Sequence, residues 1–144
     1  MAALEGLPTD RVPLFPLLMF LAANRAGITY RDYATNGRAL AEAQLLVQER
    51  YGLDAITACS DAFRISADLG AEMAYPLDKP PYATEPLITP GTKLEKLARP
   101  DPGRRGSRMA DRVLAVERMA RHAAGQVAVL GWIDMPFAEA CALC

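Results

Sequence analysis

Apolar and polar positions follow two periods along the chain, one typical of strands and the other of helices. Short runs of apolar and β-branched residues predict strands that are buried on both faces. These runs lie at 10–15, 54–58 and 126–132, with a weaker one at 73–75. Elsewhere, apolar residues recur at helical spacing. This spacing predicts helices at 17–25, 36–51, 62–69 and 107–122, and a last helix from Pro136 onward.

Residues at the ends of these segments support the boundaries. Thr29 and Asp32 form the capping-box pattern that opens a short helical turn. Asn36 and Ser107 are typical N-caps. Gly52 suits the left-handed position that ends a helix. The segment 76–90 carries five prolines, so we expect a loop there.

Each long helix has one face that we expect to be buried. For the helix at 36–51, the expected buried residues are Leu40, Ala43 and Val47. On its solvent side we place Glu42, Gln44, Gln48 and Arg50. For the helix at 107–122, the expected buried residues are Met109, Val113, Val116 and Ala120.

Strands that alternate with helices indicate parallel β/α units with right-handed crossovers. The last helix stops in apolar residues, with no cap and no polar tail. Three such units leave a small open sheet with bare edges, through which we expect self-association. We therefore predict a single α/β domain over 1–144, a partial TIM (β/α)8 barrel made of its first three or so β/α units.

Composition narrows the classes of function. The formal net charge of -1 argues against bulk electrostatic capture of nucleic acid or of an anionic membrane. The longest apolar run, 12–23, is too short for a membrane span and contains two prolines. Three cysteines give no disulfide framework, so we expect a reducing cytoplasm.

Asp61 is the first candidate for chemistry. It follows the predicted strand at 54–58, and α/β proteins place their functional groups beyond the carboxyl ends of parallel strands. The alternative is that Asp61 only caps the following helix, a role that aspartate fills well.

Three motifs resemble the uroporphyrinogen decarboxylase family. The matching segments are Ala3–Gly6 with Asp10–Pro13, Glu49–Ala55 with Ser60–Asp61, and Leu130–Trp132 with Pro136–Ala140. The resemblance implies a TIM barrel with its active site at the carboxyl ends of the strands. It also implies one of two activities on a tetrapyrrole or corrinoid. One is decarboxylation of uroporphyrinogen in porphyrin biosynthesis, without a cofactor. The other is methyl transfer from a methylcobamide to a thiol, with zinc.

The methyltransferase branch fits the sequence better. Decarboxylases have an arginine-rich segment after the first strand that binds substrate carboxylates. Here the corresponding stretch is apolar, and only Arg25 near its end could serve as a substrate-binding arginine. Arg25–Tyr33 and Pro76–Tyr82 look like the methyltransferase branch. The zinc ligands of that branch lie further along the barrel than residue 144, so no metal site is expected in this chain.

The resemblance also assigns site residues. Asp61 aligns with the aspartate that, in the decarboxylase, faces the pyrrole N–H groups, which would make it a catalytic residue. Trp132 and Asp134 would face the same mouth and contact substrate, the tryptophan by packing against a tetrapyrrole. The alternative for this pair is a rim aromatic and a turn carboxylate. Met135 departs from the family, which has glycine before Pro136.

Other reactive residues are expected to be structural. Cys141 and Cys144 form a C-x-x-C without further ligands, so we expect buried helical thiols. Cys59 lacks a nearby base, because the only histidine, His122, ends a surface helix. A basic cluster without interleaved aromatics is expected to be solvated, with no nucleic acid as partner. Its members are Arg99, Arg104, Arg105, Arg108 and Arg112.

Three hypotheses remain open. The first is a corrinoid-dependent methyltransferase whose partners are a corrinoid and a corrinoid protein. The second is a uroporphyrinogen decarboxylase. The third is a non-catalytic fragment that assembles with another chain. In each case we expect the 144 residues alone to be inactive.

Overall fold

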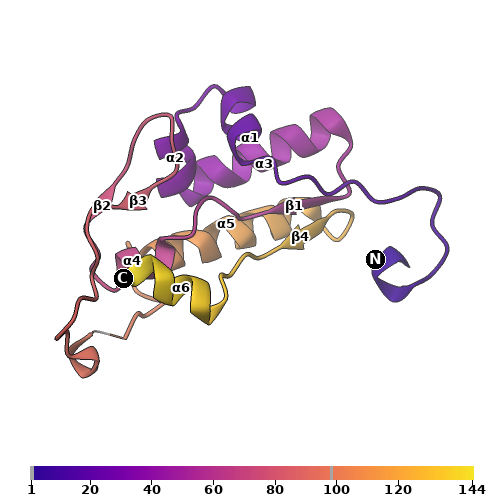
Figure 1. The fold of residues 1–144 in the computed structure, drawn as a ribbon. Helices are drawn as coiled ribbons and strands as arrows, with labels where there is room; N and C mark the ends of the chain where they lie inside the picture. The colour runs from indigo at the N-terminus through magenta and orange to yellow at the C-terminus, as the bar shows by residue number, and fades with distance from the viewer. Residues whose placement is uncertain (1, 98) are drawn as a thin grey trace.

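The computed structural model describes residues 2–97 and 99–144. It contains a short 3-10 helix at each of Ala2–Glu5 and Leu94–Lys96, six α-helices and four strands in the described residues (Figure 1). The helices are α1 (Met19–Ala26), α2 (Tyr30–Thr35), α3 (Gly37–Tyr51), α4 (Arg64–Asp68), α5 (Arg108–Ala123) and α6 (Pro136–Leu143). The strands are β1 (Ala55–Thr57), β2 (Met73–Ala74), β3 (Tyr82–Ala83) and β4 (Ala128–Leu130).

Side-chain caps fix the starts of three helices, as the sequence predicts. Thr29 Oγ1 accepts a hydrogen bond from the Asp32 N–H at 3.1 Å, opening α2. Asn36 Oδ1 accepts from the N–H groups of the first turn of α3, and Ser107 Oγ accepts from Ala110 N–H in α5. Gly52 ends α3 with φ +62°, in the left-handed region.

Two of the four predicted strands, those at 54–58 and 126–132, form the central sheet. β1 and β4 pair in parallel, with Ile56 opposite Val129. A helix lies between them in sequence, which gives the predicted β/α arrangement. All three residues of β1 are buried, which confirms the expectation of a strand covered on both faces.

The strand predicted at 10–15 is not present. That segment is extended but forms no ladder, and one backbone bond joins it to the sheet, from Asp54 N–H to the Leu14 carbonyl at 3.0 Å. Pro13 and Pro16 lack the N–H groups that a ladder requires, which explains the interruption. The Asp54 carboxylate holds the segment instead, accepting from Leu14 N–H at 2.8 Å and from Arg11 at 2.7 Å.

The sequence predicts only one strand of a two-stranded antiparallel hairpin. The expected short strand at 73–75 is present as β2, but it pairs antiparallel with β3, which lies in the proline-rich segment expected to be a loop. The prolines flank Tyr82 and Ala83 instead of interrupting them, so both residues keep their N–H groups.

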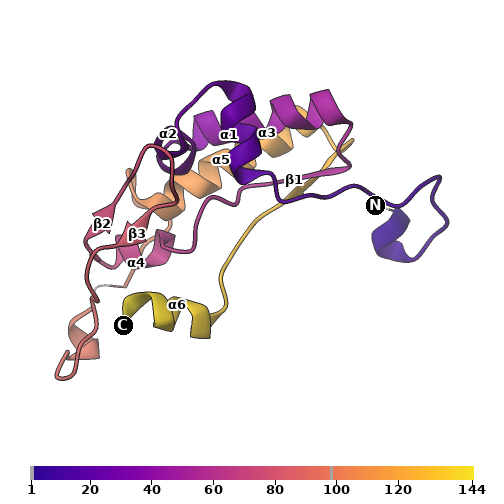
Figure 2. The same ribbon diagram turned by 45° about the horizontal axis from the view of Figure 1, so that its top comes forward.

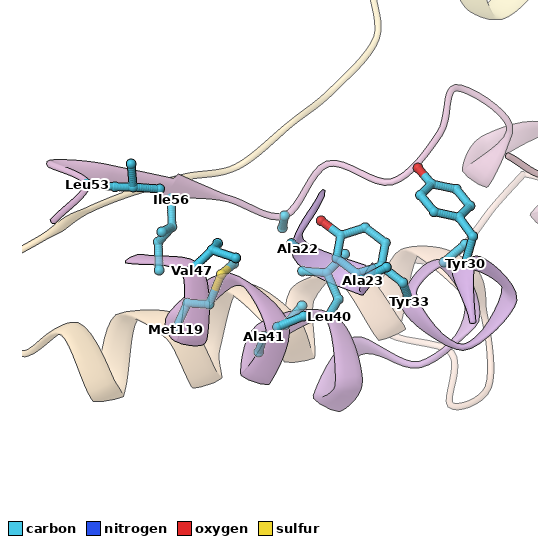
Figure 3. Packing of buried hydrophobic residues seen from close by; sticks show 14 residues of the cluster. Ala22, Ala23, Tyr30, Tyr33, Leu40, Ala41, Val47, Leu53, Ile56 and Met119 are labelled. Atoms are coloured by element: carbon cyan, nitrogen blue, oxygen red, sulfur yellow. The ribbon is translucent and has the colours of Figure 1, made fainter. Parts of the chain in front are cut away.

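The core lies between the sheet and three helices on one side of it. In Figure 2, α1, α3 and α5 lie on one side of β1 and α6 lies on the other. Ile56 of β1 points toward Val47 of α3 and Met119 of α5 (Figure 3). Leu40, Ala43 and Val47 are fully buried, as expected.

The predicted buried face of α5 is wrong for Val113 and Ala120, which are exposed, whereas Val116 is partly buried against the core. The residues that α5 buries are Arg112, Ala115, Met119 and Ala123, whereas Val113 is 49% exposed. This face packs against α3, and it includes a charged residue that a hydrophobicity pattern assigns to solvent. The same error applies to Gln44, which is 2% exposed because its amide donates to the Tyr33 hydroxyl at 2.7 Å.

Among the helices of residues 2–97 and 99–144, none combines the length and the apolar character that crossing a membrane requires.

Candidate functional site

The carboxyl ends of β1 and β4 meet because the two strands are parallel neighbours. Thr57 Oγ1 and Ala58 N–H both donate to the Leu130 carbonyl, at 3.1 and 3.2 Å. The turn that follows β1 carries Asp61, and the loop that follows β4 carries Trp132 and Asp134. Three of the four residues predicted as site residues therefore lie at one edge of the sheet.

Asp61 is held by four hydrogen bonds. Its Oδ1 accepts from Phe63 N–H at 3.0 Å and from Arg108 Nη1 at 2.8 Å. Its Oδ2 accepts from Ser60 Oγ at 2.6 Å and from Arg108 Nη2 at 2.7 Å. The side chain is 1% exposed. Since a carboxylate has about four lone-pair positions, every acceptor position of Asp61 is used within the chain.

The pair between Asp61 and Arg108 is fully charged. Burial alone would raise the pKa of Asp61, but the hydrogen bonds and positive charge of Arg108 outweigh it and hold the pKa below its usual range. Burial lowers the pKa of Arg108, and Asp61 more than restores it. The Arg108 guanidinium also lies 5.5 Å from the centre of the Tyr75 ring and donates to the Ala34 carbonyl at 2.9 Å.

A second acidic residue joins α4 to the start of α5. The carboxylate of Asp68 accepts from the backbone N–H groups of Arg108 and Met109, at 2.8 and 2.9 Å. These N–H groups have no partner within the helix, and a negative charge there is favourable. The segment from Asp61 to Asp68 is therefore fixed to α5 at both of its ends.

Arg64 connects the two strand ends. Its Nη2 lies 3.0 Å from Asp134 Oδ2, and both side chains are largely buried, at 6% and 15% exposed. Its Nη1 donates to the Asp61 carbonyl. Asp134 Oδ1 also lies 3.4 Å from Trp132 Nε1, and Trp132 is 41% exposed. The ion pair thus holds the loop that presents Trp132.

Two buried tyrosines of α2 donate hydrogen bonds to the backbone of the turn that follows β1. Tyr30 donates to the Ser60 carbonyl at 2.5 Å and Tyr33 donates to the Cys59 carbonyl at 3.1 Å. Burial raises the pKa of both hydroxyls, so they remain neutral donors. The backbone before Asp61 is consequently held in one conformation.

Arg25 lies apart from these residues. Its Nε donates to the Tyr51 hydroxyl at 2.8 Å, at the end of α3 that precedes β1, whereas Asp61 follows β1. The structure therefore does not bring Arg25 to the carboxyl edge of the sheet. Its predicted role in substrate binding receives no geometric support.

The basic cluster divides into two groups. Arg99, Arg104 and Arg105 are exposed, as expected. The expectation of solvation is wrong for Arg108 and for Arg112, which are largely buried in ion pairs with Asp61 and Asp111. Helical spacing does not reveal the pair of Arg108 with Asp61, because the two residues lie 47 positions apart.

Thiol and metal chemistry have little support in the described residues. Cys59 is buried, and burial raises the pKa of its thiol. Cys141 and Cys144 are exposed, so their predicted burial is wrong, because Leu143 is the buried residue of α6. His122 is exposed at the end of α5. Within 2–97 and 99–144, no cluster of three or more His, Cys, Asp or Glu could hold a metal ion.

A pocket of about 340 Å³ lies beside these residues. Arg64, Trp132 and Asp134 line it from the strand ends, and Met109 and Arg112 line it from α5. Arg64 and Arg112 were missed by sequence reasoning. For Arg64 the available signal is its place shortly after a predicted parallel strand, but no such signal points to Arg112, which lies on α5 before β4.

Comparisons with known proteins identify the family and the fold of the chain. A sequence model of the family described as uroporphyrinogen decarboxylase (URO-D) matches residues 1–144. No curated protein matches the chain. Among solved structures, a methyltransferase from Methanosarcina mazei has a TM-score of 0.80 at 22% identity, over 99% of this chain and 43% of that protein. The chain thus spans less than half the length of that methyltransferase, and the similarity confirms the predicted partial barrel.

Proposed function

Because the chain belongs to the uroporphyrinogen decarboxylase family, we propose that it supplies the first β/α units of a corrinoid-dependent methyltransferase. The reaction would move a methyl group from a methylcobamide to a thiol or similar acceptor. The named methyltransferase of similar fold is consistent with this branch, although the argument rests on the site.

The observation that carries the proposal is that Asp61 already accepts four hydrogen bonds within the chain. Decarboxylation in this family needs a carboxylate that accepts hydrogen bonds from pyrrole N–H groups. Here Arg108, Ser60 and Phe63 occupy all the acceptor positions of Asp61, and the side chain is 1% exposed. A direct catalytic role for Asp61 therefore requires that Arg108 release at least one oxygen. We propose instead that Asp61 positions the turn after β1.

The distribution of arginines also favours methyl transfer. A substrate with many carboxylates needs cationic side chains that are free to bind them. At the edge of the described sheet, Arg64 and Arg108 are already paired with Asp134 and Asp61. Arg25 lies at the other end of β1, bonded to Tyr51. At this edge Arg112 keeps buried nitrogens without a partner, and a single buried arginine is too few for a substrate with many carboxylates.

Trp132 is the residue of this chain best suited to contact a corrinoid. Its half-exposed indole follows β4 and is steadied by Asp134 and Arg64. A flat apolar ring of this kind can pack against a macrocycle. A bound corrinoid would supply the methyl group. The described cysteines and histidine do not cluster, so zinc does not fit these residues, and any zinc ligands would lie outside them.

The reading frame after Cys144 tests the proposal. An in-frame continuation that carries a His-x-Cys and a later cysteine would supply the zinc ligands of the methyltransferase branch. A continuation without them would favour the decarboxylase. If the frame stops, the third hypothesis, a fragment that assembles with another chain through its open sheet edges, gains support. Size-exclusion mass and thermal unfolding of the 144 residues then decide it, because a monomer that unfolds cooperatively contradicts assembly.

A further inference from the structure

The pocket beside the strand ends has the features of a small-molecule site. Its volume of about 340 Å³ is at the lower end of the range for ligand pockets. Ile65, Met109, Val113, Val116 and Trp132 form apolar walls. A volume of this size suits a small ligand and is too small to enclose a tetrapyrrole.

Two polar groups on the pocket wall lack partners in the described part of the chain. Arg112 is 8% exposed, and only its Nη2 is bonded, to Asp111 and to the Ala34 carbonyl. Its Nε and Nη1 are buried with no hydrogen-bond acceptor. On α6, Glu139 Oε2 is buried with no donor. Buried polar atoms without partners are costly, so a ligand that supplies one acceptor and one donor would be favoured.

The remaining charges of the pocket disfavour a ligand that carries only negative or only positive charge. Arg64 and Asp134 neutralise each other at 3.0 Å. Glu117 and Glu139 would repel a simple anion, and Arg112 would repel a simple cation. Burial is the main cause that raises the pKa of Glu139 and lowers the pKa of Arg112, and Asp111 compensates Arg112 only through Nη2, which leaves Nε and Nη1 without an acceptor. A ligand with both charges compensates both groups.

We propose that this pocket binds a small zwitterion with an apolar substituent, such as an α-amino acid with an aromatic side chain. The ligand carboxylate accepts hydrogen bonds from Arg112, and its ammonium group donates to Glu139. The apolar substituent packs among Met109, Val116 and Trp132. The pocket shares Trp132 with the proposed corrinoid contact, but binding of the zwitterion does not depend on methyl transfer.

Trp132 is the only tryptophan of the chain, so its fluorescence reports on this pocket directly. The probes are L-phenylalanine, 3-phenylpropionate, which lacks the ammonium group, and phenethylamine, which lacks the carboxylate. Phenylalanine is expected to shift the emission with saturation, and the other two to bind at least tenfold more weakly. Equal binding of either one-charge analogue, or no saturable binding of phenylalanine at millimolar concentration, overturns the proposal.

Two variants locate the binding. Glu139→Gln removes the negative charge that would accept the ammonium group, and it is expected to weaken the binding of phenylalanine at least tenfold. Thermal unfolding should not change, because Glu139 Oε2 has no hydrogen-bond partner in the folded chain. Val116→Phe fills the pocket and is expected to abolish binding. The control is Glu42→Gln, an exposed glutamate of α3 paired with Arg38, which should bind as the wild type. Unchanged binding in either pocket variant contradicts the site.

Discussion

Asp61 and Arg108 form a bidentate ion pair that joins the end of β1 to the first turn of α5, with both Nη–Oδ distances between 2.7 and 2.8 Å. The two residues are 47 positions apart, and their side chains are 1% and 11% exposed. Because the pair is buried and bidentate, it fixes a helix start to a strand end. It also uses both oxygens of Asp61, which limits the hydrogen bonds that Asp61 can accept from a substrate.

Asp61→Asn is expected to destabilise the fold by about 3 kcal/mol, because it leaves Arg108 buried without a counter-charge. The free energy of unfolding in urea measures the loss. The matched control is Glu42→Gln, which breaks the exposed Arg38–Glu42 pair and should cost less than about 1 kcal/mol. Similar losses for the two variants would contradict a structural role for the Asp61 pair.

The contribution of Asp61 should depend on pH in one direction. The pKa of Asp61 is lower in the folded chain than the ordinary value of about 3.9. Its stabilisation is therefore complete above that ordinary value and is lost as the pH falls through the lowered folded value. The stability difference between the wild type and Asp61→Asn should be constant from about pH 7 to pH 5 and shrink below about pH 4. A difference that persists undiminished at the lowest accessible pH would be inconsistent with this linkage.

Gly37→Ala should disrupt the contact between α3 and α5. A Cβ at Gly37 would lie 2.2 Å from the Asp111 carbonyl oxygen, a backbone atom that cannot move without shifting α5. We expect a loss of about 2 kcal/mol or more, measured by thermal or urea unfolding. Gly131→Ala is the control, because its added Cβ would meet nothing within 4 Å. Wild-type stability in Gly37→Ala would mean that the two helices do not approach this closely.

The three thiols should separate into two classes. Cys141 and Cys144 are exposed, whereas Cys59 is 5% exposed and burial raises the pKa of its thiol. Titration with a thiol-specific chromogenic reagent should therefore modify two cysteines in the folded protein and the third only after unfolding. Rapid modification of Cys59, identified by mass spectrometry, would contradict the packing of the turn after β1.

The sequence predicts most of the helices and the β1–β4 pair, because caps such as Asn36 and Ser107 and the buried run at 54–58 are local signals. It fails where tertiary packing buries polar side chains and where prolines interrupt a strand. Arg112 and Gln44 look like solvent residues, but the folded chain buries both, Arg112 in an ion pair with Asp111 and Gln44 bonded to Tyr33. The segment at 10–15 looks like a strand, but Pro13 and the following Pro16 lack the N–H groups that a ladder requires.

The candidate site was predictable in position but not in detail. Asp61, Trp132 and Asp134 follow predicted parallel strands, so their common edge could be inferred. The arginines that neutralise the two aspartates come from α4 and α5, and no spacing rule connects Arg64 with Asp134 across 70 residues. Because Arg108 donates to both oxygens of Asp61, the carboxylate is interpreted as already hydrogen-bonded within the chain, not as free to accept from a substrate.

The choice between the two activities is tested most directly by parallel turnover. The protein produced from the reading frame, with any continuation after Cys144, is incubated with methylcobalamin and a thiol, and separately with uroporphyrinogen. The account predicts loss of the methyl group from methylcobalamin and formation of a thioether, with uroporphyrinogen unchanged, and it predicts neither reaction for the 144 residues alone. Release of carbon dioxide from uroporphyrinogen, with methylcobalamin unchanged, would contradict it.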